Sequence, residues 1–496
     1  MRIGNFVAEG FRRFGEKPAR SLWIFTAVSG LIWVVQTSLC QKILPLDVIE
    51  AIVWGEQLQW GQMKSPPLSG WVAYGFSLLS GHADWALYLA AQLCTVCGIW
   101  FTYKLAREFF DECEAATAAL LLYFLFYYMP PSMKFCSHDT QIALLPAIGF
   151  FFWRSLRDDR LRDWLACATV SALAVLGKYS AAQLLLGCLA FMVCTRLGRS
   201  RFKSAGPYLA GGLFLLLLLP HLRWLFHHDF LSVRHMEDRV ANPWCWTDPL
   251  EAAGNMLMPV LVGVGALLIA GLPWKRLPRR TEPPNTALAY ALTLTFVPGG
   301  IYLLLSLSGH SIVMQWYSYL ASFSGIAAVA LMPWKIDPRT FRRLLVVLWL
   351  YFVVLLVVVT ADVMLRPRRK IHTDPRDIAQ AADRCFREQT GRPIPVVYGH
   401  RWLAGVVENY LPYRPPACAD QDVCALELHE RRMRREGALI VFDAPQQPTW
   451  LLRRRNAPPL TWRQVPVVFR APAGRTKTFS LYLAVLPPER ETETGE

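Results

Sequence analysis

The amino-acid sequence predicts a polytopic α-helical membrane protein of about eleven transmembrane helices, followed by a small C-terminal α/β domain. Hydrophobic residues make up 54% of the 496 residues and charged residues 18%, which is less charge than a soluble chain of this length carries. The apolar residues form runs that approach the roughly 20 residues needed to cross a bilayer as a helix. After residue 365 these runs end, and charged residues and prolines become frequent.

Eleven apolar runs are the predicted spans. They are residues 22–39, 85–103, 115–129, 141–153, 164–176, 181–195, 206–220, 254–274, 287–307, 311–332 and 344–365. The shortest of these runs can still cross a bilayer if their polar ends lie at membrane depth inside a helix bundle. The stretch 71–80 is too short to span alone and is interpreted as the end of an outer loop that leads into the second span.

The distribution of lysine and arginine predicts the topology. Segments that lie inside when the N-terminus is inside hold 23 of these residues, and the outer connections before residue 364 hold seven. The positive-inside rule therefore places the N-terminus inside and, with eleven spans, the C-terminus outside. On this interpretation the net charge of +15 is a topology signal, and no nucleic-acid partner is expected. The first run ends without a cleavage site and is expected to remain as an anchor.

The chain divides into three parts on this interpretation. Residues 1–20 are a basic inner arm, residues 21–365 are the membrane body with long outer loops at 40–84 and 221–253, and residues 366–496 are the outer α/β domain. That domain is predicted to hold helices at 375–390 and 404–410 and strands at 395–398, 438–442, 463–470 and 478–486. A Cys418–Cys424 disulfide is expected in an oxidising compartment, with Cys385 as an alternative partner.

The first long outer loop carries the most informative residues. Asp47 and Glu50 follow the first span three residues apart, so that they share one helical face, and Lys64 precedes a double proline. An acid at this boundary can be solvated, can pair with a basic residue, or can act as a general base. The lysine can contact lipid headgroups or offset the charge of a phosphate.

Further polar residues lie at the outer ends of other spans. His138 and Asp139 begin the fourth span, where an ionisable residue entering the membrane is a functional candidate. Lys178 lies between the fifth and sixth spans and either binds phosphate or extends its ammonium group to the membrane surface.

The second long outer loop holds Arg234 and His235 as candidate phosphate contacts, and His310 in the last outer connection can line the same cavity. The histidine spacing 221, 227, 228 fits no standard zinc pattern. No metal site or other cofactor is therefore predicted, although a divalent metal remains an open alternative.

In order and sidedness, these motifs resemble bacterial membrane-embedded C-type glycosyltransferases (glycosyltransferase family 39-like). This superfamily includes the protein O-mannosyltransferases and the lipid A aminoarabinose transferases. The resemblance implies the C-type glycosyltransferase fold and an acid after the first span, beside the reacting centre. Asp47, Asp139 and, more weakly, Glu50 take catalytic roles on this basis. The donor phosphate is expected to contact Lys64, His138, Lys178, Arg234, His235 and His310.

The resemblance also implies the reaction. A sugar would move from an undecaprenyl-phosphate carrier to lipid A phosphate or another envelope glycan, on the periplasmic face of a bacterial inner membrane. Protein O-glycosylation is the alternative acceptor chemistry, and a lipid-linked sugar transporter or flippase is the alternative class. A transporter would show inverted repeats and midplane polar sites, whereas here the polar residues gather at one face. A monomer is expected.

Two departures leave the substrates open. The first outer loop lacks the Asp-Glu pair and the Glu-Lys-Pro-Pro element of the aminoarabinose transferases, so neither sugar nor acceptor is assigned. Residues 398–402 and 408–412 resemble a motif in the outer domains of the bacterial subgroup, and their role is interpreted as structural or acceptor-side.

Overall fold

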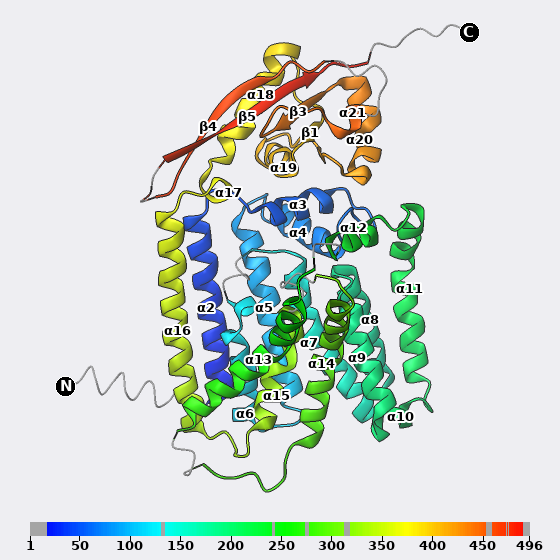
Figure 1. Ribbon diagram of the computed structural model, residues 1–496, viewed down its shortest axis with the longest axis vertical. Coiled ribbons are helices and arrows are strands. Elements are labelled where there is room, and N and C mark those ends of the chain that lie inside the picture. Colours follow the sequence, from blue (N-terminus) through cyan, green and yellow to red (C-terminus); the bar gives the residue numbers. More distant parts are fainter. Residues whose placement is uncertain are drawn as a thin grey trace, which may run out of the picture. The chain divides into compact units, whose positions relative to one another are not determined.

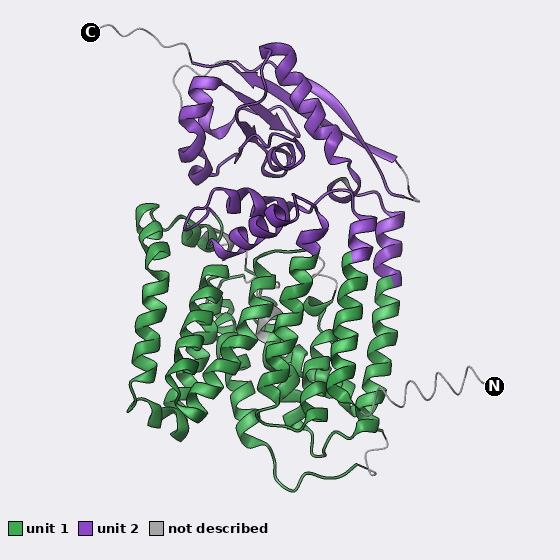
Figure 2. Cartoon of the chain, turned by 180° about the vertical axis from the view of Figure 1, so that it is seen from behind, with its two compact units in different colours: residues 1–34, 64–66, 89–356 green, residues 35–63, 67–88, 357–496 purple. Residues whose placement is uncertain are grey.

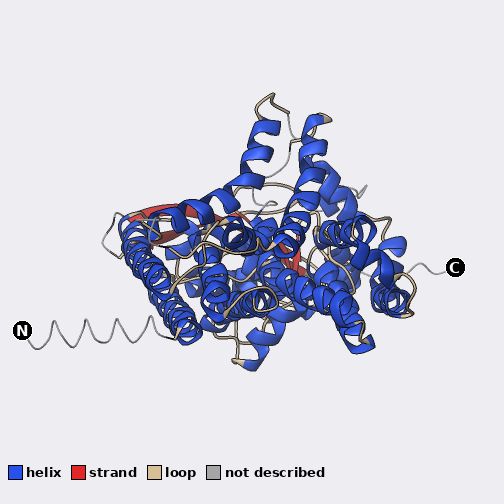
Figure 3. Ribbon diagram, turned by 90° about the horizontal axis from the view of Figure 1, so that it is seen from below, coloured by secondary structure: helices blue, strands red, loops and turns tan. Residues whose placement is uncertain are grey.

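The computed structural model describes residues 17–129, 134–240, 244–272, 277–311, 318–452, 459–472, 474 and 476–489. The chain forms two compact units (Figure 2). Unit 1 comprises residues 1–34, 64–66 and 89–356, and unit 2 comprises residues 35–63, 67–88 and 357–496. Helix dominates the described chain, and every named strand belongs to unit 2 (Figure 3).

Unit 1 is helical (Figure 1). Three helices have residues in both units: α2 (Pro18–Cys40), α5 (Trp85–Ala106) and α16 (Pro338–Leu365). The other elements of unit 1 are α6 (Glu112–Leu121), η1 (Leu122–Phe124), η2 (Phe126–Tyr128), α7 (Ser137–Asp158), α8 (Leu161–Gly177), α9 (Ala181–Cys194), α10 (Arg196–Arg201), α11 (Gly206–His227), α12 (Leu231–Val240), α13 (Asp248–Ala270), α14 (Asn285–Leu307), η6 (Ser318–Phe323) and α15 (Ser324–Leu331).

Small residues allow these helices to approach closely. A side chain on Gly98 of α5 would collide with the backbone carbonyl of Ile142 in α7, and one on Gly325 of α15 would collide with that of Ala118 in α6. Close backbone approach at glycine is a common packing mode between membrane helices, where helix association depends on van der Waals contact. A buried ion pair adds to this packing, because Arg280 lies 2.6 Å from Glu114 at the start of α6.

Each predicted span overlaps a described helix, and these helices differ in length and polarity. In the described part of the chain, six helices are long and apolar enough to cross a membrane: α2, α5, α11, α13, α14 and α16. Helices α6, α8, α9 and α15 contain 10, 17, 14 and 8 residues. Helix α7 has 22 residues but carries charged residues near both ends. A multi-pass helical body is therefore established, and the count of eleven spans remains a prediction.

Unit 2 combines two helices of the first long loop with a small α/β domain (Figure 1). Its elements are α3 (Leu46–Glu56), α4 (Leu68–Leu79), α17 (Arg369–His372), α18 (Pro375–Thr390), β1 (Val397–Gly399), α19 (Arg401–Tyr410), β2 (Ala417–Ala419), α20 (Val423–Glu436), β3 (Ala438–Phe442), α21 (Thr449–Leu452), β4 (Arg463–Arg470) and β5 (Thr476–Leu486). The sheet order is β2-β1-β3-β5-β4. Strand β1 is parallel to β2 and β3, and β5 is antiparallel to β3 and β4.

One expectation from the sequence is corrected in unit 2. Cys385, Cys418 and Cys424 are all free and buried, so the expected disulfide is absent. Each of these thiols lies in the apolar interior, where a cysteine packs as a small hydrophobic residue. The stretch 71–80 belongs mostly to α4, a helix of 12 residues, which is too short to span a bilayer alone, as the sequence predicted.

Candidate functional site

The turn between α8 and α9 places Lys178 beside the start of α7. Gln141 of α7 donates from Nε2 to the carbonyl oxygen of Ala174 in α8, at 3.0 Å. A side chain at Gly177 would crowd the hydroxyl group of Thr140, so glycine allows the end of α8 to reach the start of α7. Helix α8 ends at Gly177, and Lys178 follows with extended backbone. This local geometry places the side chain of Lys178 beside the first turn of α7.

Lys178 and His138 form the centre of the candidate site in unit 1. The Lys178 Nζ atom lies 3.2 Å from Nδ1 and 3.3 Å from Nε2 of His138. An ammonium group can only donate, so the imidazole nitrogen that it contacts accepts. The pair then carries a positive charge next to a helix N-terminus, and both features attract a phosphate group.

A second set of contacts connects this turn to α11 and α12. The Tyr179 hydroxyl group lies 3.1 Å from Nε2 of His221 and 2.6 Å from Oγ of Ser232. Ser232 is in the first turn of α12, so Arg234 and His235 follow within one helical turn. Arg234 is exposed and His235 is partly buried. The Tyr179 contacts therefore position α12 relative to Lys178.

Asp139 has a defined structural contact. Its carboxyl group is 2% exposed and accepts a hydrogen bond from the backbone N–H of Cys136, at 2.8 Å, in a capping box at the start of α7. Such a cap stabilises a helix by about 0.5–2 kcal/mol. The structure thus assigns Asp139 to the N-terminus that carries His138, and its catalytic role stays a prediction.

The two acids of α3 have different environments in unit 2. Asp47 is exposed in the first turn of α3, where a carboxylate is favoured by the helix dipole. Glu50 is buried, and Arg401 of α19 donates to its Oε1 atom at 3.2 Å. Burial raises the pKa of Glu50 to about 8, against the opposing effect of Arg401. Asp47 can therefore meet a ligand in water, whereas Glu50 joins two helices.

Further contacts fix α3 on the α/β domain. Trp54 donates from Nε1 to Oδ2 of Asp422 at 2.9 Å. Glu56 accepts from Arg414 at 2.7 Å. A side chain at position 405 of α19 would collide with Ile49 of α3, so the two helices lie in close contact. These contacts determine where Asp47 is held relative to the α/β domain.

The remaining predicted residues have separate positions. Lys64 belongs to unit 1 and is partly buried. His310 is exposed after the end of α14, where its Nδ1 atom lies 3.0 Å from Oγ of Ser308. The structure therefore brings His138 and Lys178 into contact, with Arg234 and His235 on a helix held to the same turn.

Sequence reasoning missed the roles of Tyr179, His221 and Ser232. Their signal was present, because Tyr179 follows Lys178 directly and His221 is a polar residue late in an apolar run. Within the ranges that the structure describes, no group of three or more His, Cys, Asp or Glu residues is arranged to hold a metal ion.

Comparison with known proteins supports the fold. The family model for dolichyl-phosphate-mannose-protein mannosyltransferase matches residues 64–224. The structure of ArnT from Cupriavidus metallidurans bound to undecaprenyl phosphate is similar, with a TM-score of 0.61 and 15% identity over 93% of this chain and 97% of that chain. Both findings agree with the C-type glycosyltransferase fold. The resemblance predicted from the sequence is thereby confirmed.

A second structure gives the same picture of the fold. ArnT from the same organism in the apo state has a TM-score of 0.57 and 16% identity, over 94% of this chain and 98% of that chain. No curated protein sequence matches this chain. The segment matched by the family model includes Lys64, His138, Asp139 and Lys178, and it ends before Arg234.

Proposed function

We propose that this glycosyltransferase moves a sugar from an undecaprenyl-phosphate carrier to an envelope acceptor, either the phosphate of lipid A or another envelope glycan. The observation that carries the proposal is the contact between Lys178 and His138 at the N-terminus of α7. We place the reaction on the periplasmic face of a bacterial inner membrane, with the N-terminus inside and the α/β domain outside, following the distribution of basic residues.

The chemistry of the leaving group explains the cations. When the bond between the sugar and the carrier breaks, negative charge develops on the phosphate, and fixed positive groups lower the energy of that state. Lys178 supplies a point charge, and the guanidinium of Arg234 can bind two phosphate oxygens at once. Lys64, His235 and His310 are further candidates for the same phosphate.

Asp47 is the proposed general base. Its exposed position in the first turn of α3 lets it reach an incoming hydroxyl group. A phosphate acceptor would need no proton removal, and Asp47 would then orient hydroxyl groups of the sugar. Glu50 is a weaker candidate because it contacts Arg401. We keep Asp139 as a second candidate acid at the N-terminus of α7.

Donor binding tests the role of Lys178. In purified full-length chain, Lys178→Gln is expected to weaken binding of an undecaprenyl-phosphate sugar roughly 10- to 100-fold, because a charged hydrogen bond is worth about 1.5–3 kcal/mol. Lys203→Gln is the matched control, since Lys203 is an exposed lysine elsewhere in unit 1. Equal donor affinity in wild type and Lys178→Gln would contradict the proposed phosphate contact.

Turnover tests the role of Asp47. Asp47→Asn keeps the size of the side chain and removes its basicity, so turnover is expected to fall about 10²–10⁴-fold while donor binding persists. Near-normal turnover would show that the acceptor needs no base, or that another carboxylate acts as the base.

The acceptor is tested by mass spectrometry of a deletion strain. Loss of a sugar from lipid A would support the proposed acceptor. Loss of a sugar from envelope proteins would instead support protein O-glycosylation, the second candidate, which the description of the matched family model favours. No change in any lipid, glycan or protein sugar would contradict both.

A further inference from the structure

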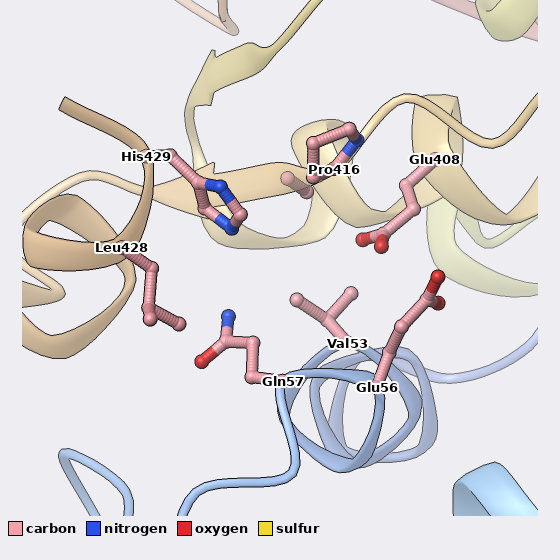
Figure 4. Close-up of a pocket in the computed structure, with 8 residues that line it drawn as sticks. Val53, Glu56, Gln57, Glu408, Pro416, Leu428 and His429 are labelled. Atoms are coloured by element: carbon pink, nitrogen blue, oxygen red, sulfur yellow. The ribbon is translucent and has the colours of Figure 1, made fainter. Parts of the chain in front are cut away.

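Unit 2 contains a pocket that the proposed donor site does not use (Figure 4). Its volume is about 230 Å³, and it lies among the end of α3, the end of α19, the start of β2 and the middle of α20. Its lining residues are Val53, Glu56, Gln57, Glu408, Pro416, Ala417, Leu428 and His429. Glu408 opens the stretch 408–412, whose role the sequence left as structural or acceptor-side.

The pocket contains polar atoms that no described residue satisfies. Glu408 is 2% exposed, and its Oε2 atom has no hydrogen-bond partner in the described part of the chain. The same holds for the Nε2 atom of Gln57. Figure 4 shows the carboxyl group of Glu408, the amide of Gln57 and the ring of His429 directed toward the shared space. An unsatisfied buried polar group is destabilising, so these atoms favour a ligand that forms hydrogen bonds.

The pKa shifts in this pocket favour the uncharged forms of two polar groups. Burial, reinforced by the charge of Glu56 and by a side-chain hydrogen bond to it, raises the pKa of Glu408 well above its ordinary value and favours its protonated form. Burial and Arg432 lower the pKa of His429, which leaves a neutral imidazole. The charge of Glu56 is offset by Arg414, which donates to it at 2.7 Å.

This set of groups selects a class of ligand. An apolar ligand would leave the buried donors and acceptors unpaired, and an anion would meet two carboxyl groups. A cation would find Arg414 close by, and no group of three metal-ligating side chains occurs in the described ranges. A neutral molecule with several hydroxyl groups satisfies the polar atoms, while Val53, Pro416 and Leu428 cover its C–H surface.

The volume limits the size of that molecule. The volume of the pocket is about 230 Å³. Pockets for drug-sized ligands start near 300 Å³. A single sugar ring therefore fits the volume better than an oligosaccharide does.

We propose that this pocket is a subsite for one neutral sugar ring, held by hydrogen bonds to Glu408, Gln57 and His429. The choice of a sugar among hydroxyl-rich molecules rests on the proposed function, because a glycosyltransferase handles sugars on both its donor and its acceptor. The ring can come from the lipid-linked donor or from an acceptor glycan. Its recognition chemistry is the same in both cases.

Direct binding tests the subsite. Saturation-transfer NMR on the full-length chain in detergent would use free glucose, galactose, mannose and N-acetylglucosamine as probes. Leu428→Trp fills the pocket from a residue that is 48% exposed, and Glu408→Met removes the central polar group at similar size. Both variants are expected to reduce the binding of the preferred sugar at least tenfold. Leu452→Trp, at an exposed leucine of α21 in the same unit, is the matched control and should bind normally.

Two results would overturn the subsite. One is the absence of saturation transfer to any of the four sugars in the wild-type chain. The other is equal sugar binding by wild type and Leu428→Trp, a variant that keeps all the buried polar groups. Because Leu428 is an exposed position, misfolding is not expected to hide the answer, and retained thermal unfolding of the variant checks this.

Steady-state kinetics distinguishes the two sources of the sugar. If Leu428→Trp raises KM for the undecaprenyl-phosphate sugar, the subsite holds the donor sugar, and if it raises KM for the acceptor, the subsite holds an acceptor ring. Failure of the proposed function remains separable, because free-sugar binding is measured without turnover. Lys178→Gln belongs to unit 1 and should leave free-sugar binding unchanged even if donor binding is lost.

Discussion

Replacing Glu50 by glutamine is expected to reduce the sensitivity of unit 2 to alkaline pH. Glu50 is 8% exposed between α3 and α19, and Arg401 donates to it at 3.2 Å. Burial raises its pKa from an ordinary 4.5 to about 8. Glutamine has the same shape and still accepts the hydrogen bond from Arg401, but it carries no proton that pH can remove.

The pKa shift sets the direction and the size of the effect. Below about pH 4.5 Glu50 is protonated in both states, so the shift has no effect on stability. Between about pH 4.5 and pH 8 the unfolded chain releases the proton while the folded chain keeps it, so stability falls as pH rises. At about 1.4 kcal/mol per pH unit, the loss is roughly 3 kcal/mol at pH 7 and reaches about 5 kcal/mol at pH 8 and above.

Thermal unfolding from pH 5 to pH 9 measures this loss. In purified full-length chain in detergent, the wild-type Tm should fall by several degrees across this range, and Glu50→Gln should fall less. Tryptophan fluorescence is a suitable signal because Trp54 lies in α3 and contacts Asp422. Glu427→Gln, at an exposed acid of α20, is the control and should follow the wild type. Parallel Tm curves for Glu50→Gln and wild type would refute the reasoning.

Three further substitutions test contacts within unit 1 or within unit 2. Gly405→Val introduces a side chain that collides with Ile49, so the free energy of unfolding is expected to fall by about 1–3 kcal/mol in denaturant or thermal unfolding. Unchanged stability would show that α3 does not lie against α19. Arg280→Met leaves Glu114 buried without its cation and should lower the free energy of unfolding by about 3–5 kcal/mol. Combining Arg280→Met with Glu114→Gln should restore much of the lost stability. Tyr410→Phe removes a hydroxyl group that joins two segments of unit 2 and is expected to cost about 1–3 kcal/mol, an effect that a thermal scan resolves.

Several elements follow from local sequence alone. Helix α18 was predicted at its observed bounds, because Asp374 caps its first turn, Gly391 ends it with a positive φ, and one face of the segment is apolar. Strand β3 was likewise predicted, since its five apolar residues form a fully buried run. Helix α20 was missed. Its sequence is rich in Arg and Glu, and few of its side chains are buried, so it has too few apolar residues to stand out in the sequence.

The candidate site was likewise predictable only in part. Asp47 and Lys178 were selected from the sequence because their positions match motifs of the resembled superfamily, and His138 also because an ionisable residue entering the membrane is costly unless it has a role. Their environments were not predictable. Asp139 forms the capping box of its own helix, a contact that depends on the backbone angles of Cys136. The expected disulfide failed because cysteine spacing does not report where each thiol lies in the fold.

The sequence by itself determined where apolar helices occur and which superfamily these motifs resemble. These properties depend on neighbours along the chain, through the cost of placing charges and unpaired backbone groups in a bilayer. The tertiary structure decided which groups meet. Glu50 and Arg401 are 351 positions apart, and Glu408 faces a pocket that α3 helps to line. Such contacts, and the pKa shifts that burial causes, arise only when distant segments pack together and exclude water.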